Sequence, residues 1–473
     1  MHCSPITGVY FVQVFERAAA LQLERWIAKP HRKPLVIRGA RQVGKSTLVR
    51  QFAGRKKRRL FEVNLERHPS LARVIDSLDP RSVLREIEFL ADRGEVNARD
   101  SLVFLDEVQA VPKALQCLRY FLEELPDLPV VAAGSLLEFT LAEHSFPMPV
   151  GRVEYFHLGP VSWEEFLSAR GETQLLALLG NYTLGEVFPN SAHDRLLRLL
   201  REFLLVGGMP EAVQVFLEQN HLPAVFEIHD SIIETYRDDF SKYATGTDLV
   251  RLQRVMDYLG RHVCEKVKYS NIDRESQARE VRRALDLLIK AGVVFAAIHS
   301  HGDGVPLRAH AEERVFKLYN LDLSFFNRAS GITSLREVDL LDRRFINEGC
   351  LAEQFVAQQL HFASAPGHKP ELHYWLREGR TGNAEVDFLQ VAGTQVFPVE
   401  VKAGKAGSLK SLVQFAALRG NPVACRLDLN PPSRQTIRHV LADGDVRFEM
   451  VSLPLMMCGQ MGRLVESAIR ARG

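Results

Sequence analysis

The chain has few cysteines, no long apolar run and no excess of either charge. Its six cysteines are scattered over 473 residues without a CxxC pair or other metal-ligand spacing, which argues against a disulfide framework or a structural zinc site. No stretch approaches the ~20 apolar residues of a membrane-spanning helix, and the N-terminus lacks a basic region followed by a continuous apolar one. These absences predict reduced thiols and a cytoplasmic protein that is neither secreted nor inserted in a membrane.

Chain length limits the number of domains, and net charge limits how the chain can attract nucleic acid. At 473 residues the chain exceeds the limit of about 250–300 residues for a single hydrophobic core, so two to four domains are expected. Lys and Arg total 60 against 58 Asp and Glu, so attraction for nucleic acid has to come from local clusters. We find no internal repeat and no low-complexity tract.

Between residue 35 and about residue 160, short β-rich runs alternate with helical patterns. The runs are PLVIRG, LFEVNL, SLVFLDE, PVVAAGS and VEYFHLG. This alternation predicts an α/β fold with a parallel sheet and crossover helices. Polar residues follow three of the runs, where open α/β sheets bind their ligands, and that arrangement suits a nucleotide.

The segment GARQVGKS fits the GxxxxGK[ST] pattern of a P-loop and lies between an apolar run and an amphipathic helix. Its backbone N–H groups are expected to surround the phosphates of ATP, Lys45 to reach the outer phosphates, and Ser46 to ligate Mg²⁺. A chance glycine-rich turn is the alternative. The predicted nucleotide-binding residues are Gly39, Ala40, Arg41, Gln42, Val43, Gly44, Lys45, Ser46 and Thr47.

Two adjacent acids end the run SLVFLDE. We expect Asp106 to hold the hydrated Mg²⁺ and Glu107 to orient or deprotonate the attacking water, as carboxylates do in phosphoryl transfer. The alternative is an acid-rich start of a helix, which needs no ligand.

Two more residues are candidates for the same reaction. Ser135 ends the run PVVAAGS, where its hydroxyl can sense the γ-phosphate or simply form a turn. Arg152 precedes the run VEYFHLG and can either stabilise transition-state charge at the nucleotide of a neighbouring subunit or make a salt bridge.

Beyond the predicted sheet the pattern becomes helical. The segments EEFLSA, RLLRLLREFLL and AVQVFLEQN predict a small helical lid, and REVRRALDLLIKAG followed by VVFAAIHS suggests a winged helix. This second region contains basic residues, several of them spaced to share one helix face that can bind DNA phosphates: Arg261, Lys266, Lys268, Arg274, Arg279, Arg282, Arg283 and Lys290. The alternative is a solvated helix with ion pairs to Glu275, Glu280 and Asp286.

A second cluster lies near the C-terminus. Period-two alternation puts Glu400 and Lys402 on one face of a strand, and a hairpin would bring Asp387 beside them. Two such carboxylates can bind Mg²⁺ while a lysine stabilises the transition state of phosphodiester hydrolysis, and Glu353 on the preceding helix can complete the site. A salt bridge on a solvated sheet face is the alternative.

The motifs GARQVGKS, VFLDEVQ, AAGS, PVSWEEFL and VGGMPEAV, together with a GR pair before a strand, resemble those of archaeal and bacterial AAA-type ATPases that carry a C-terminal domain of unknown function. Asp387, Glu400 and Lys402 resemble the D…ExK motif of the restriction-endonuclease-like fold, with Glu353 at the position of its helical acid. The resemblance implies a P-loop ATPase core that commonly forms oligomers. VGGMPEAV contains no arginine that matches a second sensor.

We therefore expect a P-loop AAA+ core (1–165), a helical lid (166–238), a winged-helix-like module (239–317), an α/β restriction-endonuclease-like domain (318–435) and an extension (436–473). The predicted function is that of an ATP-driven, homo-oligomeric machine acting on duplex or branched DNA, in repair, recombination or defence. The alternative is a regulatory or scaffold ATPase whose C-terminal domain binds without cutting. A metabolic kinase is the third possibility.

Overall fold

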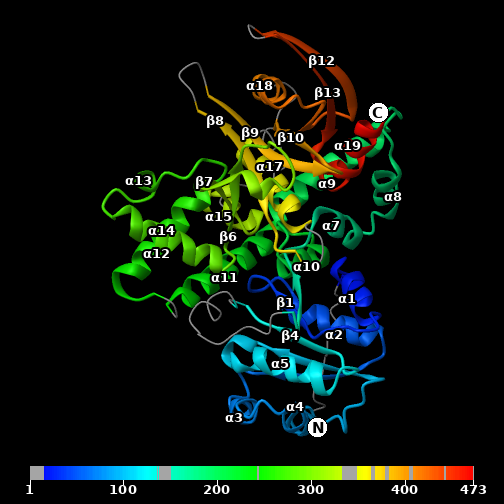
Figure 1. Cartoon of the computed structure of the whole chain (residues 1–473), viewed down its shortest axis with the longest axis vertical. Coiled ribbons are helices and arrows are strands. Elements are labelled where there is room, and N and C mark those ends of the chain that lie inside the picture. The colour runs from blue at the N-terminus through cyan, green and yellow to red at the C-terminus, as the bar shows by residue number, and fades with distance from the viewer. Residues whose placement is uncertain are drawn as a thin grey trace, which may run out of the picture.

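A computed structural model describes residues 15–135, 137, 151–241, 244–332, 349–363, 368–378, 383–403, 409–441 and 444–471. The chain forms two sheets, which lie toward opposite ends of the molecule, with a helical region between them (Figure 1).

The first sheet has five parallel strands in the order β2-β3-β4-β1-β5. Each strand forms from one of the five apolar runs of the sequence, and the predicted parallel sheet is confirmed. The strands are β1 (Leu35–Arg38), β2 (Arg59–Asn64), β3 (Ser101–Asp106), β4 (Val130–Ala133) and β5 (Glu154–His157).

Helices cover both faces of this sheet because successive strand residues point to opposite sides. On one face, Ile37 and Phe104 pack in a core with α1 (Ala19–Ile27) and α2 (Lys45–Arg55). On the other face, Val36 and Val103 pack with the helices α3 (Leu71–Ile75), α4 (Pro80–Ala91) and α5 (Lys113–Glu124), and a short 3₁₀ turn, η1 (Val108–Ala110), precedes α5.

The helical region follows β5 and joins the larger hydrophobic core. Gly208 is required at the turn before α10, because an added Cβ would lie 2.3 Å from the carbonyl oxygen of Val161. The helices are α7 (Trp163–Ala169), α8 (Thr173–Asn181), α9 (Asn190–Val206), α10 (Pro210–Gln219) and α11 (Leu222–Phe240).

Three further helices precede a two-stranded antiparallel ribbon. They are α12 (Gly246–Arg261), α13 (Tyr269–Ile272) and α14 (Ala278–Lys290), and the ribbon consists of β6 (Val294–Ser300) and β7 (Ala311–Asn320), joined through the 3₁₀ turn η2 (Leu307–His310). The ribbon is not free-standing, since β6 pairs in parallel with β8 of the second sheet.

The second sheet has eight strands in the order β12-β13-β11-β10-β9-β8-β6-β7. Its remaining strands are β8 (Leu372–Arg377), β9 (Ala384–Ala392), β10 (Gln395–Val401), β11 (Val423–Asp428), β12 (Ser433–Leu441) and β13 (Gly444–Pro454). The helices α15 (Leu323–Ala329), α17 (Gly349–Phe362) and α19 (Met461–Arg470) and the turn η5 (Leu455–Gln460) belong to the larger core, and α18 (Lys410–Arg419) packs in a separate one.

Two of the boundaries expected from the sequence, after residues 317 and 435, fall inside β7 and β12. Residues on both sides of each of these two boundaries therefore belong to one continuous sheet. Residues 436–473 supply most of β12 and all of β13 to this sheet, and their helix α19 packs against it. The sequence could not show this, because the pairing of β6 with β8 joins strands more than 70 residues apart in the chain.

Among the described residues no helix is both long and apolar enough to cross a membrane. None of the five cysteines in this part of the chain forms a disulfide, as the sequence predicts for these positions. Cys3 lies outside the described residues.

Candidate functional site

The P-loop connects the end of β1 to the start of α2, and its backbone has the conformations that such a loop requires. Gly44 has φ 90° and Gln42 has φ 60°, both in the left-handed region. A Cβ at Gly39 would lie 2.2 Å from the carbonyl oxygen of Leu158, so only glycine fits there. α2 begins at Lys45, and its first N–H groups are therefore available to bind an anion.

Lys45 is 7% exposed and folds back over this loop. Its Nζ donates hydrogen bonds to the carbonyl oxygens of Ala40 at 2.7 Å and Gly39 at 3.1 Å. Burial lowers the pKa of Lys45 to about 8, although Glu107 and Asp106 oppose this shift. The ammonium group is therefore held at the mouth of the P-loop with carbonyl partners that an incoming phosphate can replace.

Two hydrogen-bonded pairs stand next to Lys45. Ser46 Oγ donates to Asp106 Oδ2 at 2.7 Å, and Ser135 Oγ donates to Glu107 Oε2 at 3.3 Å. Asp106 ends β3 and Ser135 follows β4, so the parallel sheet brings both pairs to its carboxyl edge. Burial raises the pKa of Asp106, and a cation beside it would relieve this cost.

A cavity of about 550 Å³ lies over these groups. That volume is within the range of ligand sites, about 300–1,000 Å³. The P-loop, Glu107 and Ser135 line this cavity together with Arg50 and Gln51 of α2. Residues far away in the sequence line the rest of it: Phe15, Arg17, Pro210, Glu211, Gln214 and Thr235. These distant residues were missed from the sequence, because they come from α10, α11 and the segment before α1.

The helix α11 contacts the P-loop at Arg41. The Nε atom of Arg41 forms an ion pair with Asp239 Oδ2 at 2.8 Å, and the Tyr236 hydroxyl donates to the carbonyl oxygen of Arg41 at 2.8 Å. Both α11 residues are buried, at 1% and 6% exposure for Tyr236 and Asp239. In this contact the P-loop supplies the arginine and α11 supplies the acid.

The four residues predicted near the C-terminus also come together. Asp387 on β9 accepts a hydrogen bond at Oδ2 from the backbone N–H of Val401 at 2.7 Å, and Glu400 on β10 pairs with Lys402. Glu353 on α17 acts electrostatically on both Asp387 and Glu400. The side chains therefore share one site, whatever its chemistry.

Two residues of β7 belong to this cluster and were missed from the sequence. Lys317, 1% exposed, donates to Glu353 Oε1 at 3.0 Å and pairs with Glu385, and the Tyr319 hydroxyl donates to the same Glu353 oxygen at 2.7 Å. Although burial lowers the pKa of Lys317, Glu353, Asp387 and Glu385 together raise it well above its usual value. Lys317 is thus a buried permanent cation among these carboxylates.

Lys317 does not compensate all of the negative charge of these buried carboxylates. Burial and the charges of Glu353 and Glu400 raise the pKa of Asp387 well above its ordinary value, and burial raises that of Glu400. Glu400 is 4% exposed and its Oε2 has no hydrogen-bond partner in the structure. Such oxygen donors fit a hard divalent cation such as Mg²⁺.

Another group of potential metal ligands lies on the β6–β7 ribbon. Ligand atoms of His299, His301 and Glu312 are within 4.8 Å of one another. Nδ1 of His299 accepts a hydrogen bond from the backbone N–H of Leu376 at 3.2 Å, which leaves the proton of the neutral ring on Nε2. His299 is therefore poorly prepared to ligate a metal.

Comparison with protein families agrees with the geometry of the first site. Residues 31–167 match a family model described as an AAA domain. This part of the chain is an AAA domain. Residues 197–336 and 348–446 match two models described as domains of unknown function, DUF8612 and DUF4143, and no curated protein matches the chain.

Solved structures similar to the chain include three with 12% sequence identity. The Aeropyrum pernix ORC2 protein has a TM-score of 0.32 over 67% of this chain and 92% of its own. The Thermotoga maritima RuvB Holliday junction branch migration motor has a TM-score of 0.25 over 59% and 84%. A STAND signal transduction ATPase from Pyrococcus horikoshii has a TM-score of 0.25 over 74% and 49%.

Arg152 lies at the edge of the AAA domain, before β5. Its side chain is 50% exposed and lies 3.6 Å from Glu123 Oε1 on α5. Arg152 does not line the nucleotide cavity of its own chain as far as the described residues show. Its action on the nucleotide of a neighbouring subunit stays a prediction.

The predicted basic face lies outside the AAA domain, on and around α14. Arg279, Arg282, Arg283 and Lys290 are exposed along one side of this helix. Two of the acids proposed as their partners pair with α12 instead: Glu280 with Arg251 at 3.1 Å and Glu275 with Arg254 at 3.8 Å.

Proposed function

We propose that the chain hydrolyses ATP at the P-loop of its AAA domain. The observation that carries this proposal is the convergence of Lys45, the Ser46–Asp106 pair and the Glu107–Ser135 pair at one cavity. Lys45 and the N–H groups at the start of α2 bind the phosphates. Ser46 and Asp106 would hold Mg²⁺, which would supply positive charge to the bound phosphates.

Glu107 performs the proton chemistry in this proposal. Its carboxylate orients a water molecule in line with the γ-phosphate and accepts a proton from it. The water oxygen bonds to the γ-phosphorus while the bond from that phosphorus to the bridging oxygen breaks, so that ADP and phosphate leave. Ser135 holds that carboxylate in place by its hydrogen bond and reports the presence of the γ-phosphate. Arg152 of a neighbouring subunit would supply positive charge from outside, which makes a homo-oligomer the active form.

The test is the Lys45→Ala variant of the full chain. We expect it to abolish ATP hydrolysis, because it removes the ammonium group that the P-loop carbonyls hold close to Asp106 and Glu107. Lys113→Ala is the matched control, since Lys113 is 53% exposed on α5 and away from the cavity. Hydrolysis by Lys45→Ala at the rate of the control would overturn the assignment.

We further propose that ATP hydrolysis drives work on DNA, with the exposed basic face of α14 binding phosphates as in a winged helix. If it does, affinity falls with salt with a slope of about −0.9 for each phosphate neutralised on duplex DNA. Replacing Arg279, Arg282 and Arg283 by glutamine should then reduce this slope. An unchanged slope would exclude this face.

The cluster of Asp387, Glu400, Lys402 and Glu353 supports a metal-dependent, restriction-endonuclease-like site. The unpartnered, buried Oε2 of Glu400 favours a cation there. Linear, branched and single-stranded DNA are incubated with Mg²⁺ or Mn²⁺, with and without ATP, and wild type is compared with Asp387→Ala. Cleavage that the variant loses supports a nuclease.

The second candidate function is a scaffold ATPase that binds DNA or protein without cutting. Lys317 favours it, because this buried cation already neutralises part of the acidic cluster. Binding of DNA without cleavage under all these conditions would support the scaffold.

A further inference from the structure

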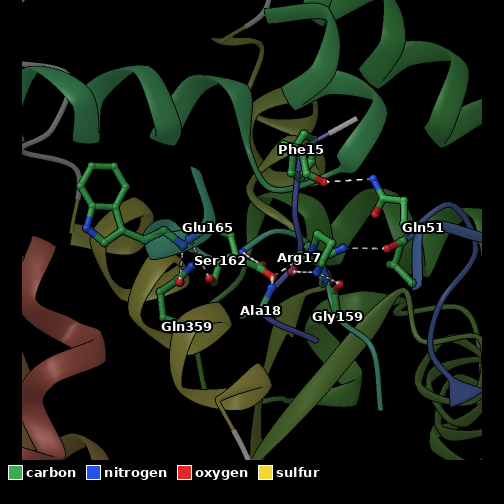
Figure 2. Close-up of polar contacts among 11 residues, drawn as sticks. Phe15, Arg17, Ala18, Gln51, Gly159, Ser162, Glu165 and Gln359 are labelled. Atoms are coloured by element: carbon green, nitrogen blue, oxygen red, sulfur yellow. Dashed lines mark hydrogen bonds and ion pairs between the residues drawn. The ribbon is translucent and has the colours of Figure 1, made fainter. Parts of the chain in front are cut away.

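Arg17 joins the P-loop to the segment that follows β5 (Figure 2). It is 7% exposed and precedes α1. Its Nε donates to Glu165 Oε1 at 3.0 Å, one terminal nitrogen donates to the Val43 carbonyl at 3.0 Å, and the other donates to the Gly159 carbonyl at 2.9 Å. One planar cation therefore fixes a P-loop carbonyl, a loop carbonyl and a carboxylate relative to one another.

Glu165 carries this connection into the first turn of α7. Its Oε2 accepts from the backbone N–H of Ser162 at 2.8 Å, while the Ser162 hydroxyl accepts from the N–H of Glu165 at 3.2 Å. This is a capping box, in which both side chains hold the start of the helix. The position of Glu165 thus determines where the next backbone N–H, that of Trp163, points.

The N–H of Trp163 donates to Gln359 Oε1 on α17 at 2.8 Å. A second contact lies beside it, because an added Cβ on Gly159 would be 2.2 Å from the ring of Phe362. The segment that Arg17 holds is therefore packed against α17 at two points.

α17 also carries Glu353 of the C-terminal cluster, six residues before Gln359 on the same helix. Between them, Gln354 exchanges two hydrogen bonds with the backbone of Asn320, each 2.9 Å long. Because Glu353 and Gln354 both bind β7 from α17, a displacement of α17 would act directly on the hydrogen bonds of Glu353 with Lys317 and Tyr319.

Arg17 stands between two cavities. It lines the nucleotide cavity of about 550 Å³, and it lines a second cavity of about 270 Å³ together with Gln358, Gln359 and Phe362 of α17. A triphosphate in the first cavity is a strong anion that competes with Glu165 for the guanidinium group.

We propose that the Arg17–Glu165 pair transmits nucleotide occupancy to α17 through Trp163 and Gln359, and thereby regulates the cluster at Glu353. This inference rests on the proposed nucleotide site. It supplies the link between the two sites that the lid sequence does not provide.

The test is hydrogen exchange of α17 in the full chain, with and without Mg²⁺ and the non-hydrolysable analogue AMP-PNP. Nucleotide affinity is measured in parallel with a fluorescent ATP analogue. In wild type, AMP-PNP should change the exchange of α17 amides by about fivefold or more, the lower end of typical coupling between sites. In Gln359→Leu the affinity should persist within about threefold while the change in α17 exchange disappears.

Two further variants separate coupling from general damage. Gln359→Glu keeps an acceptor for the N–H of Trp163, so AMP-PNP should change its α17 exchange as it does in wild type. Gln460→Leu removes a contact of 2.8 Å to Glu164 on the same helix α7, but not the contact to α17, and should also respond like wild type.

The outcomes are distinct. Wild type that binds nucleotide without any change in α17 exchange overturns the inference and leaves the proposed ATP site standing, as does a Gln359→Leu variant that responds like wild type. Wild type that binds no nucleotide overturns the ATP site and the inference with it.

Discussion

Arg41 on the P-loop and Asp239 on the helix α11 form an ion pair with 2.8 Å between Nε and Oδ2. The side chain of Asp239 is 8% exposed and that of Arg41 is 23% exposed, so the pair is partly shielded from water. α11 therefore contacts the P-loop through a charged side chain.

Asp239→Asn should destabilise the chain by about 1–3 kcal/mol, because it leaves the half-buried Arg41 guanidinium without its counter-charge. The neighbouring Asp238 is exposed, and Asp238→Asn should have an effect within about 0.5 kcal/mol. Urea denaturation of the two variants at neutral pH measures the difference. Equal midpoints would show that the Arg41–Asp239 pair contributes nothing.

ATP affinity should depend on pH through Lys45, whose pKa in the free protein is lowered to about 8 by burial. Phosphates bind the ammonium form, so affinity should be constant below pH 8 and fall by up to about tenfold per pH unit above it. At pH 8, binding should take up about half a proton, which calorimetry in buffers of different ionisation enthalpy measures. Affinity that stays flat between pH 7 and 9.5 would contradict this prediction.

Glu107→Gln should separate binding from chemistry. The amide keeps the size of the side chain and an oxygen to accept from Ser135, but it cannot take a proton from water. We expect single-turnover hydrolysis to slow by about 10²–10⁴-fold with ATP affinity nearly unchanged. Loss of affinity together with rate would instead mean that Glu107 binds the nucleotide.

The nucleotide site was largely predictable because its signals are local. A P-loop follows a strand, and Asp106 ends another strand, and in a parallel sheet these carboxyl ends meet at one edge. Arg17 and Asp239 could not be predicted in the same way. Their partners Glu165 and Arg41 lie 148 and nearly 200 residues away, and no periodic pattern reports a contact at that separation.

The C-terminal cluster was predictable only in part. The alternation of Glu400 and Lys402 and the hairpin to Asp387 follow from strand geometry. Lys317 and Tyr319 were not predicted as part of the cluster, because β7 precedes α17 in the sequence and joins the sheet at its edge, next to β6. The sequence around Lys317 does not indicate its partner, because only the fold places Glu353 beside it.

Asp387→Asn should stabilise the chain at neutral pH. Burial and the charges of Glu353 and Glu400 raise the pKa of Asp387 in the folded state above its usual value of 3.8, and Lys317 does not cancel them. As pH falls from neutrality the folded state takes up this proton before the unfolded state does, so wild type gains stability toward pH 4. Each unit of the raised pKa corresponds to about 1.4 kcal/mol at high pH.

Asparagine has no such charge, and its oxygen can still accept the hydrogen bond from Val401. The variant should therefore exceed wild type by about 1 kcal/mol or more at pH 7.5, and the gap should close near pH 4. Unfolding midpoints at both pH values, with the exposed Asp445→Asn as control, measure this. A variant less stable than wild type at pH 7.5 would mean that Lys317 outweighs the repulsion from Glu353 and Glu400.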